Sequence, residues 1–184
     1  MTALLVLVGL AVAAAALLVG IYNRLVRLKV MCEDAWASID VQLKRRYDLI
    51  PNLVETVKGY ASHEKETLDA VIRARQAGMN AQGVEQQAQA ENMISGALRQ
   101  LFALSEAYPD LKANQNFAQL QEELSSTENK IAFARQHYNS AVGQYNTRIE
   151  VFPDNLIAGQ MGFQRREFFE LEDEAQRQAP EVKF

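Results

Sequence analysis

Cysteine, proline and glycine are scarce in this chain of 184 residues, which contains one, four and nine of them. The single cysteine, Cys32, excludes an internal disulfide framework and fits a reducing compartment. The prolines and the closely spaced glycine pairs mark four places, Pro51, 78–83, Pro109 and 153–162. Between them apolar residues recur at helical spacing, with hardly any signal for a strand. The sequence therefore predicts an all-α fold.

Charged residues are missing from Met1 to Asn23, where the run ALLVLVGLAVAAAALLVGIY supplies about the twenty apolar residues that a membrane-spanning helix needs. A cleaved signal peptide is the alternative, because small residues follow one another in a cleavage-like pattern. Such a peptide begins with Lys or Arg and has a shorter apolar region, however, and neither condition holds. We predict a retained transmembrane anchor over residues 1–23.

Basic residues follow the apolar run directly, at Arg24, Arg27 and Lys29, and none precedes it. The positive-inside tendency therefore favours a single-pass protein whose C-terminal domain is cytoplasmic. A periplasmic domain is the alternative.

Three apolar seams follow the anchor, each opposite a face rich in Gln, Glu, Lys and Arg. A helix with one apolar stripe cannot bury that stripe alone. We therefore predict an antiparallel bundle of three long helices over residues 24–150, with a loop at 78–83 and a turn at 108–113. The seams are Cys32, Trp36, Ile39, Leu43, Arg46, Ile50, Leu53, Val57 and Tyr60; Ala90, Ile94, Ala97, Leu101, Leu104 and Tyr108; and Phe117, Leu120, Leu124, Thr127, Ile131, Ala134, Tyr138, Ala141, Tyr145 and Ile149.

Pro51 interrupts the first seam in the stretch KRRYDLIPNLVETVKGY. A proline inside a helix removes one backbone hydrogen bond and clashes with the preceding turn, at a cost of about 3 kcal/mol. We predict that Pro51 kinks the first helix or, with Asp48 as a cap, starts a new one. The first helix is expected to run from about Arg24 to Gln76.

The helical pattern breaks at VFPDNLIAGQMGF, near the start of a C-terminal region over residues 151–184. We expect Pro153 to begin a short helix, because its fixed φ suits a first helical position. Leu156, Ile157 and Phe163 are expected to dock onto a neighbouring helix, since contiguous large apolar residues in water are a liability. A short acidic helix, REFFELEDEAQRQ, and an extended tail, APEVKF, should follow.

Spacings that build catalytic or metal sites are missing. Neither His63 nor His137 has a Glu three residues before it, as a di-iron helix pair requires. Cys32 lies on a seam, where a small buried hydrophobe is the expected role, and no Gly-rich loop follows a strand. Nineteen basic residues are outweighed by twenty-three acidic ones, which disfavours nucleic acid as a partner. We predict a non-enzymatic protein without a metal or a cofactor.

Arg46 occupies a seam position between Leu43 and Ile50. A charge directed into a bundle is costly unless it is paired. One prediction is that Arg46 pairs with Glu122 or Glu123 on another helix and so determines helix register. The equally weighted alternative is that its stem lies along the edge of the core and its guanidinium group reaches water.

Four blocks stand out in the sequence: RRYDLIPNLVETVKGYASHEKETLDAVIRAR, YPDLKANQNFAQLQEEL, TENKIAFARQHYNSAVGQYN and FPDNLIAGQMGF. In this order they resemble the LemA family of bacterial membrane proteins. The resemblance implies a transmembrane helix and a helical bundle at the bacterial inner membrane, with no established enzymatic activity. It also implies an association with membranes and with HtpX-type membrane metalloproteases, beside which relatives are encoded, and one branch belongs to magnetosome membranes. Polar Gln160 departs from the family pattern, where an apolar residue is common.

Two functions follow as expectations. The leading one is a structural scaffold or adaptor that assembles with itself or with other membrane proteins. The alternative is a module that takes a peptide or a lipid at an apolar C-terminal surface. Replacing Phe163 and Phe169 by Ser is expected to separate the two functions. The surface comprises Leu156, Ile157, Met161, Phe163, Phe168 and Phe169.

Helix lengths predict a homo-oligomer. A second helix from Val84 to Tyr108 is too short to return to the segment from Arg24 to Ile50, and we expect the third helix to turn outward again. The apolar residues of that segment are then left to neighbouring copies of the chain, which the shared anchor aligns. These residues are Leu25, Leu28, Cys32, Trp36, Ile39 and Leu43.

Overall fold

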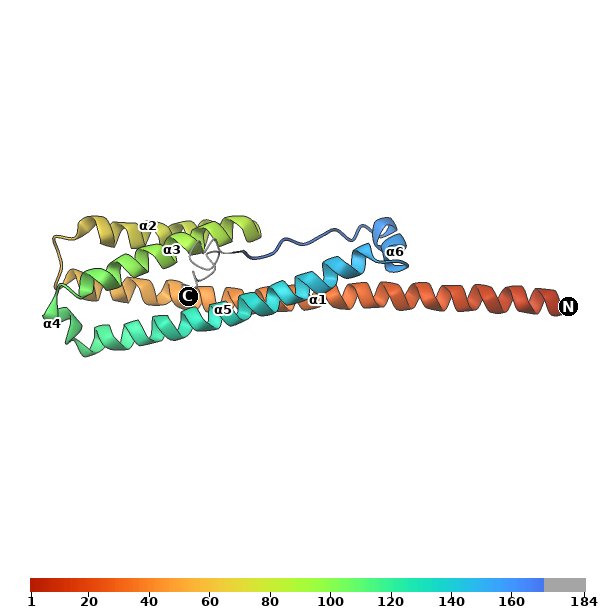
Figure 1. Cartoon of the computed structure of the whole chain (residues 1–184), viewed down its shortest axis with the longest axis horizontal. Helices are drawn as coiled ribbons and strands as arrows, with labels where there is room; N and C mark the ends of the chain where they lie inside the picture. The colour runs from red at the N-terminus through yellow and green to blue at the C-terminus, as the bar shows by residue number, and fades with distance from the viewer. Residues whose placement is uncertain (171–184) are drawn as a thin grey trace, which may run out of the picture. The chain divides into compact units, whose positions relative to one another are not determined.

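The computed structural model describes residues 1–170 of the chain and contains no strand there, which confirms the all-α prediction. Figure 1 shows the helices in chain order. They are α1 (Thr2–Lys58), α2 (Lys65–Asn80), α3 (Gly83–Ser105), α4 (Pro109–Lys112), α5 (Gln115–Glu150) and α6 (Asp154–Gln160).

The chain folds as two compact units, and the two longest helices contribute to both. The first unit comprises Met1–Ile39 and Ala134–Phe168, so it contains the N-terminal part of α1, the C-terminal part of α5, and α6. The second unit comprises Asp40–Phe133 and Phe169, so it contains the rest of α1 and α5 together with α2, α3 and α4.

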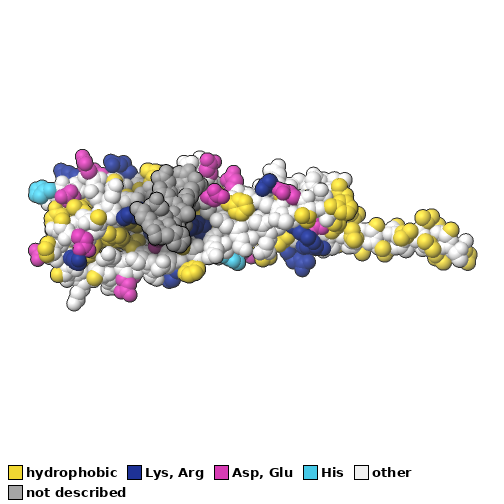
Figure 2. Space-filling view, in the orientation of Figure 1, with side chains coloured by type: hydrophobic (Ala, Val, Ile, Leu, Met, Phe, Trp, Pro, Cys, Tyr) yellow, Lys and Arg dark blue, Asp and Glu magenta, His cyan; other side chains and the backbone are white. Residues whose placement is uncertain are grey.

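The N-terminal part of α1 is long and apolar enough to cross a membrane, and no other helix in residues 1–170 is. Its large side chains are exposed, with Leu4 at 65% and Leu10 at 63%, so it is not a core helix. Figure 2 shows hydrophobic side chains along this bare segment. Burial by the chain itself begins at Ile21 and Leu25. An exposed apolar helix of this length is typical of a membrane span.

The expected first helix was wrong at its C-terminal end, and Pro51 does not start a new helix. α1 continues through Pro51 and ends at Lys58, and the chain then reverses into α2. The reversal buries Ala61 and allows the apolar stripe of α2, which includes Val71, to face the bundle. A helix that ran straight to Gln76 would have left that stripe in water. Exposing the stripe costs more free energy than interrupting the helix for one turn.

Contacts from the following helices hold this reversal in place. The Tyr108 hydroxyl donates to Glu64 Oε1 at 3.1 Å, and Asn114 Nδ2 donates to the Tyr60 hydroxyl at 2.9 Å. Both contacts join the turn after α1 to the segment around α4. The reversal is therefore decided by residues about 45 to 55 positions away in the sequence, which local propensity does not report.

The segment from Arg24 to Ile50 is covered by its own chain, so the prediction from helix lengths was wrong about this segment. The chain reverses direction after α1 ends at Lys58. As a result, α5 runs antiparallel to α1 along this segment. In the first unit, the Trp36 ring packs edge-on against Tyr138 with ring centres 5.2 Å apart. Leu25 and Ile39 are fully buried. Any interface between copies of the chain therefore has to use residues outside this buried seam.

Side-chain hydrogen bonds keep the chain after α6 extended. Asn146 Nδ2 donates to the Arg166 carbonyl at 2.8 Å, and the Arg166 N–H donates to Asn146 Oδ1 at 2.9 Å. The Tyr138 hydroxyl donates to the Glu167 carbonyl at 2.9 Å. These bonds occupy backbone groups that a helix would need, so the predicted acidic helix is absent from residues 163–170. The rest of that helix and the predicted tail lie outside the described residues.

α2 and α3 lie side by side in the second unit (Figure 1), and Gly78 sits at their contact. A Cβ atom on Gly78 would lie 2.6 Å from the Tyr47 hydroxyl oxygen and 3.0 Å from Ile94 Cδ1. Gly96 in α3 provides a contrast, because a Cβ atom there would meet no atom within 4 Å. Close packing, and not backbone flexibility, explains the glycine at position 78.

Gly78→Ala is therefore expected to lower the free energy of unfolding by about 1–3 kcal/mol, since Tyr47 has to move. Gly96→Ala, the matched control in a helix interior, is expected to be stabilising by about 0.5–1 kcal/mol. Urea unfolding of the full chain in mild detergent, followed by circular dichroism, measures both. Equal stability of the two variants would show that the Gly78 contact is not tight in solution.

Candidate functional site

A buried ionic network joins three helices of the second unit around Arg46. The Arg46 side chain on α1 is 1% exposed, and its guanidinium group contacts the carboxylates of Glu91 on α3 and Glu128 on α5. Ser95 donates to the second oxygen of Glu128 at 3.0 Å. Arg46 therefore points inward and pairs across helices, as one prediction stated, but its partners are not Glu122 and Glu123.

Tyr47 and Gln87 extend the network around Glu91. The Tyr47 hydroxyl donates to Glu91 Oε1, and Gln87 Nε2 lies 2.7 Å from the Tyr47 oxygen and 2.8 Å from Glu91 Oε1. Burial raises the pKa of Tyr47, so the hydroxyl stays a donor at neutral pH. The Glu91 carboxylate thus receives hydrogen bonds as well as the Arg46 charge, which offsets its desolvation.

Pro51 leaves the backbone carbonyl of Tyr47 free to accept a hydrogen bond from another helix. Proline has no backbone N–H, so the carbonyl of Tyr47, four residues earlier, loses its helical donor. Arg75 on α2 replaces the missing donor, because its Nε–H donates to this carbonyl oxygen at 2.7 Å. Pro51 itself is exposed and lies inside α1. The proline therefore opens a hydrogen-bonding position through which α2 attaches to α1.

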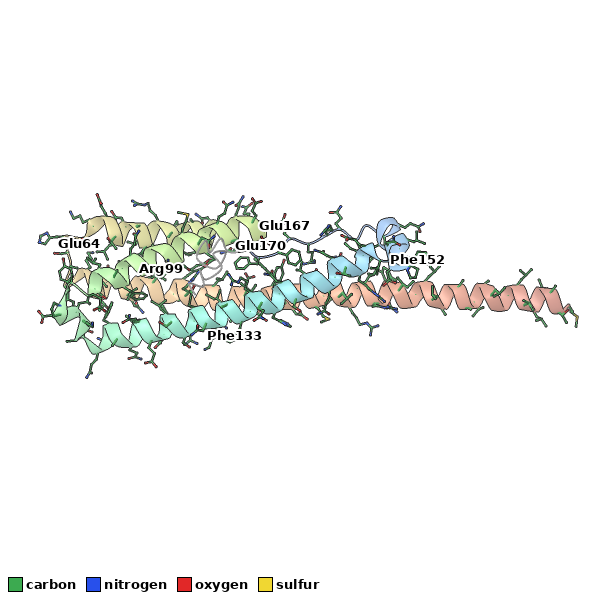
Figure 3. The ribbon with its side chains drawn as sticks, viewed as in Figure 1. Glu64, Arg99, Phe133, Phe152, Glu167 and Glu170 are labelled. Atoms are coloured by element: carbon green, nitrogen blue, oxygen red, sulfur yellow. The ribbon has the colours of Figure 1, made fainter. Side chains whose placement is uncertain are left out.

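A cavity of about 390 Å³ lies beside the network, between α3 and α5. Glu128 and Ser95 form one side of it and Arg99 another, and Arg99 is labelled in Figure 3. The Glu128 side chain is 44% exposed, so it links the buried Arg46 to the surface. Because the Arg46 guanidinium group contacts carboxylates on two other helices, the network favours one register of α3 and α5 against α1.

Two of the predicted interface residues are interior residues, and a third is partly buried. Ile39 and Leu43 are buried in the chain's own core, and Trp36 packs on Tyr138. Cys32 is also buried, and burial raises the pKa of its thiol, so the thiol stays protonated at neutral pH. Cys32, Ile39 and Leu43 therefore stabilise the fold from the interior, and Trp36 stabilises it through its contact with Tyr138.

The predicted apolar C-terminal surface does not form as one patch. Phe169 is fully buried and belongs to the second unit, whereas Leu156, Ile157 and Phe163 belong to the first. Ile157 is buried and Phe163 packs on Tyr22 of α1 with ring centres 6.0 Å apart, but Leu156 is 58% exposed. Docking was thus right for Ile157 and Phe163 and wrong for Leu156. Ser at Phe163 or Phe169 would damage packing and is not a clean test of binding.

Sequence reasoning missed the acidic residues that matter most. Glu91 lies three residues before Ile94 and Glu128 four after Leu124, so both fall on or beside a seam. Asp154, 1% exposed at the start of α6, pairs with Arg148 at 2.6 Å. A carboxylate at an apolar helical spacing opposite a seam arginine is the signal that would have found the first two. In residues 1–170 no group of three or more His, Cys, Asp or Glu is arranged to hold a metal ion.

Comparison with known proteins gives one family and several relatives. The LemA family matches residues 35–184 of the chain. Protein LemA of Metamycoplasma hominis is 31% identical over 145 residues, which cover 76% of this chain and 64% of that protein. Magnetosome protein MamQ 2 of Paramagnetospirillum magneticum is 27% identical over 175 residues, covering 81% of this chain and 64% of that protein. Magnetosome protein MamQ of Magnetospirillum gryphiswaldense is 26% identical over 168 residues, covering 76% and 62%. The chain thus spans just under two thirds of the length of these relatives.

Glu91→Ala is expected to destabilise the full chain by roughly 3–5 kcal/mol, because it removes one partner of a buried guanidinium group. The matched control is Glu123→Ala, whose carboxylate lies 3.9 Å from Arg45 at the surface. That loss should stay within about 1 kcal/mol. Urea unfolding in mild detergent compares the two variants, and a Glu91 variant as stable as the Glu123 variant would contradict the role given to the network.

Pro51 and Arg75 are expected to be coupled. Arg75→Ala should cost about 1–3 kcal/mol in the native sequence, since it leaves the Tyr47 carbonyl without a donor. In a Pro51→Ala background the cost should fall by about 1 kcal/mol, because the new N–H at position 51 bonds to that carbonyl. A double-mutant cycle of unfolding free energies measures the difference. Arg73→Ala, at an exposed position on the same helix, is the control, and equal Arg75 costs in both backgrounds would refute the coupling.

Proposed function

The chain belongs to the LemA family, and on this basis we propose that it is a non-enzymatic, membrane-anchored helical protein that acts as a scaffold or adaptor at the bacterial inner membrane. The names of its LemA and MamQ relatives denote no enzymatic activity, which supports a role in assembly over one in catalysis. The exposed apolar part of α1 supports the anchor. Arg24, Arg27 and Lys29 directly after it favour a cytoplasmic bundle.

The buried network around Arg46 is the observation that carries this proposal. It places Arg46 and Glu91 inside the bundle and Glu128 at its edge, and the contacts between these side chains join α1, α3 and α5. A bundle whose interior is locked in this way presents a rigid outer surface, which suits a protein that binds others through its helix faces.

Self-association is proposed through an exposed apolar pair in the second unit. Val41 on α1 is 63% exposed and Phe133 on α5 is 72% exposed, and Figure 3 shows Phe133 on α5. Each lies five residues from the Arg46–Glu128 contact, in opposite chain directions. Because α1 and α5 are antiparallel, the two side chains fall at the same level. They replace Trp36, Ile39 and Leu43 as the interface that a second copy would cover.

Other membrane proteins are the alternative partners. The MamQ relatives carry the name magnetosome protein, which supports the proposal that this chain acts at a membrane. An adaptor for an HtpX-type protease would use the same exposed helix faces with a foreign subunit in place of a second copy.

Phe133→Ser is expected to weaken self-association by roughly tenfold to a hundredfold, because burying a phenylalanine at an interface contributes about 1.5–3 kcal/mol. Ala132→Ser, which also places serine at an exposed position on α5, is the control and should leave association unchanged. Mass measurement of the full chain in mild detergent over a range of concentrations gives the dissociation constants.

Cross-linking in native membranes followed by mass spectrometry separates the two versions of the proposal. Links between copies that Phe133→Ser removes support the scaffold, and links to a foreign membrane protein support the adaptor. A protein that stays monomeric and forms no protein cross-links would overturn both.

A further inference from the structure

A groove of about 610 Å³ opens in the first unit where α1 leaves its uncharged stretch. Tyr22, Val26, Lys29 and Val30 line it from one face of α1, since they are spaced by four, three and one residues. The extended chain after α6 forms the opposite wall, with Phe163 and Arg165 among its residues. Each wall of the groove therefore carries both apolar and basic side chains.

Positive charge dominates the groove. Its lining contains Lys29, Arg165 and Arg166 against one carboxylate, Glu33. Arg166 is held in place, because it donates to Glu33 at 2.6 Å and its guanidinium carbon lies 6.0 Å from the centre of the Tyr145 ring. Lys29 is exposed and forms no ion pair within residues 1–170. A cation is thus left over to meet an anion.

Arg165 forms only a solvent-exposed ion pair with Glu150. Its guanidinium group lies 3.0 Å from Glu150, but the two side chains are 68% and 53% exposed. Exposed pairs of this kind contribute about 0–1 kcal/mol and exchange readily with another anion. Figure 2 shows Lys and Arg side chains gathered near the end of the bare apolar helix.

The groove lies at the depth of lipid headgroups. Its first residue, Tyr22, is next to the end of the uncharged run at Asn23. Lys29 is seven residues further on, or about 10 Å along the helix axis, and its long stem allows the ammonium group to reach back toward the bilayer. The interfacial layer of a membrane is roughly 5–8 Å thick on each side. The cations of the groove thus meet lipid phosphates directly.

Exposed apolar residues of α6 and its flanks share this level. Asp154 at the start of α6 lies 4.0 Å from Arg24, the first charged residue after the apolar run. Phe152 is 78% exposed and Met161 is 60% exposed, and Figure 3 shows Phe152 beside α6. Large apolar side chains beside a membrane span are stabilised by entering the interfacial layer. They hold the mouth of the groove against the bilayer surface.

We propose that this groove is a binding site for an anionic phospholipid. The headgroup phosphate is held by Lys29 and Arg165, and the glycerol and upper acyl chain lie along Val26, Val30 and Phe163. Arg166 acts as a positioning residue, because Glu33 and the Asn146 side chain keep it and its backbone in place. The site is independent of the scaffold role, since none of its residues belongs to the second unit.

Native mass spectrometry of the full chain in detergent tests the assignment, with phosphatidylglycerol and phosphatidylcholine added in equal amounts. The native protein is expected to retain phosphatidylglycerol in preference to phosphatidylcholine. The double variant Lys29→Glu and Arg165→Glu should lower phosphatidylglycerol retention by roughly fivefold for each lost cation. Lys130→Glu, at an exposed lysine of the second unit, changes charge in the same way and should have no effect.

A competition with soluble glycerol phosphate identifies the source of the phosphate. Millimolar glycerol phosphate should not displace the lipid, because it lacks the acyl chain that packs on Val26, Val30 and Phe163. Displacement by it, equal retention of the two lipids, or unchanged retention in the double variant would each overturn the proposal. Circular dichroism checks that the variants are folded, and the milder pair Lys29→Gln and Arg165→Gln repeats the test if the glutamates unfold the first unit. Loss of Phe133-dependent association leaves this result untouched, so the two proposals fail separately.

Discussion

A guanidinium group that is buried and keeps its charge is the constraint on which the second unit depends. An arginine side chain in a protein interior is stable only where carboxylates or other acceptors meet its guanidinium group. Glu91 and Glu128 meet this demand from α3 and α5. A shift of α3 by one turn would separate Arg46 from Glu91, both 1% exposed, and leave charges unpaired in the core. Helix register in the bundle therefore follows from one side chain.

The neighbouring residues make sense as support for that pairing. Tyr47 follows Arg46 in the chain and turns its hydroxyl toward the same carboxylate, while Gly78 leaves room for the tyrosine ring. Pro51 frees the Tyr47 carbonyl for Arg75, which attaches α2 at the same level. The proline that interrupts the seam is thus a hydrogen-bonding device within a continuous helix. Its local cost is offset by a bond between helices.

The first unit uses side-chain hydrogen bonds for a different purpose. Asn146 and Tyr138 bond the backbone at Arg166 and Glu167, and so hold an extended chain against α1 and α5. This chain forms one wall of a basic groove beside the apolar span. The same pair of helices therefore contributes to the buried ionic network in the second unit and to the basic groove in the first.

The sequence alone determined the helical class, the uncharged N-terminal run, the short helix after Pro153 and the family, because periodicity, composition and ordered blocks are local properties of the chain. It singled out Arg46 as a charge on an apolar seam, but it left open whether the guanidinium group points inward or reaches water. The tertiary structure alone decided where α1 ends, which carboxylates meet Arg46 and why residues 163–170 are extended. These outcomes depend on partners 20 to 82 positions away in the sequence. Contacts with such partners stabilise the chain only once the helices have packed, so local propensity does not report them.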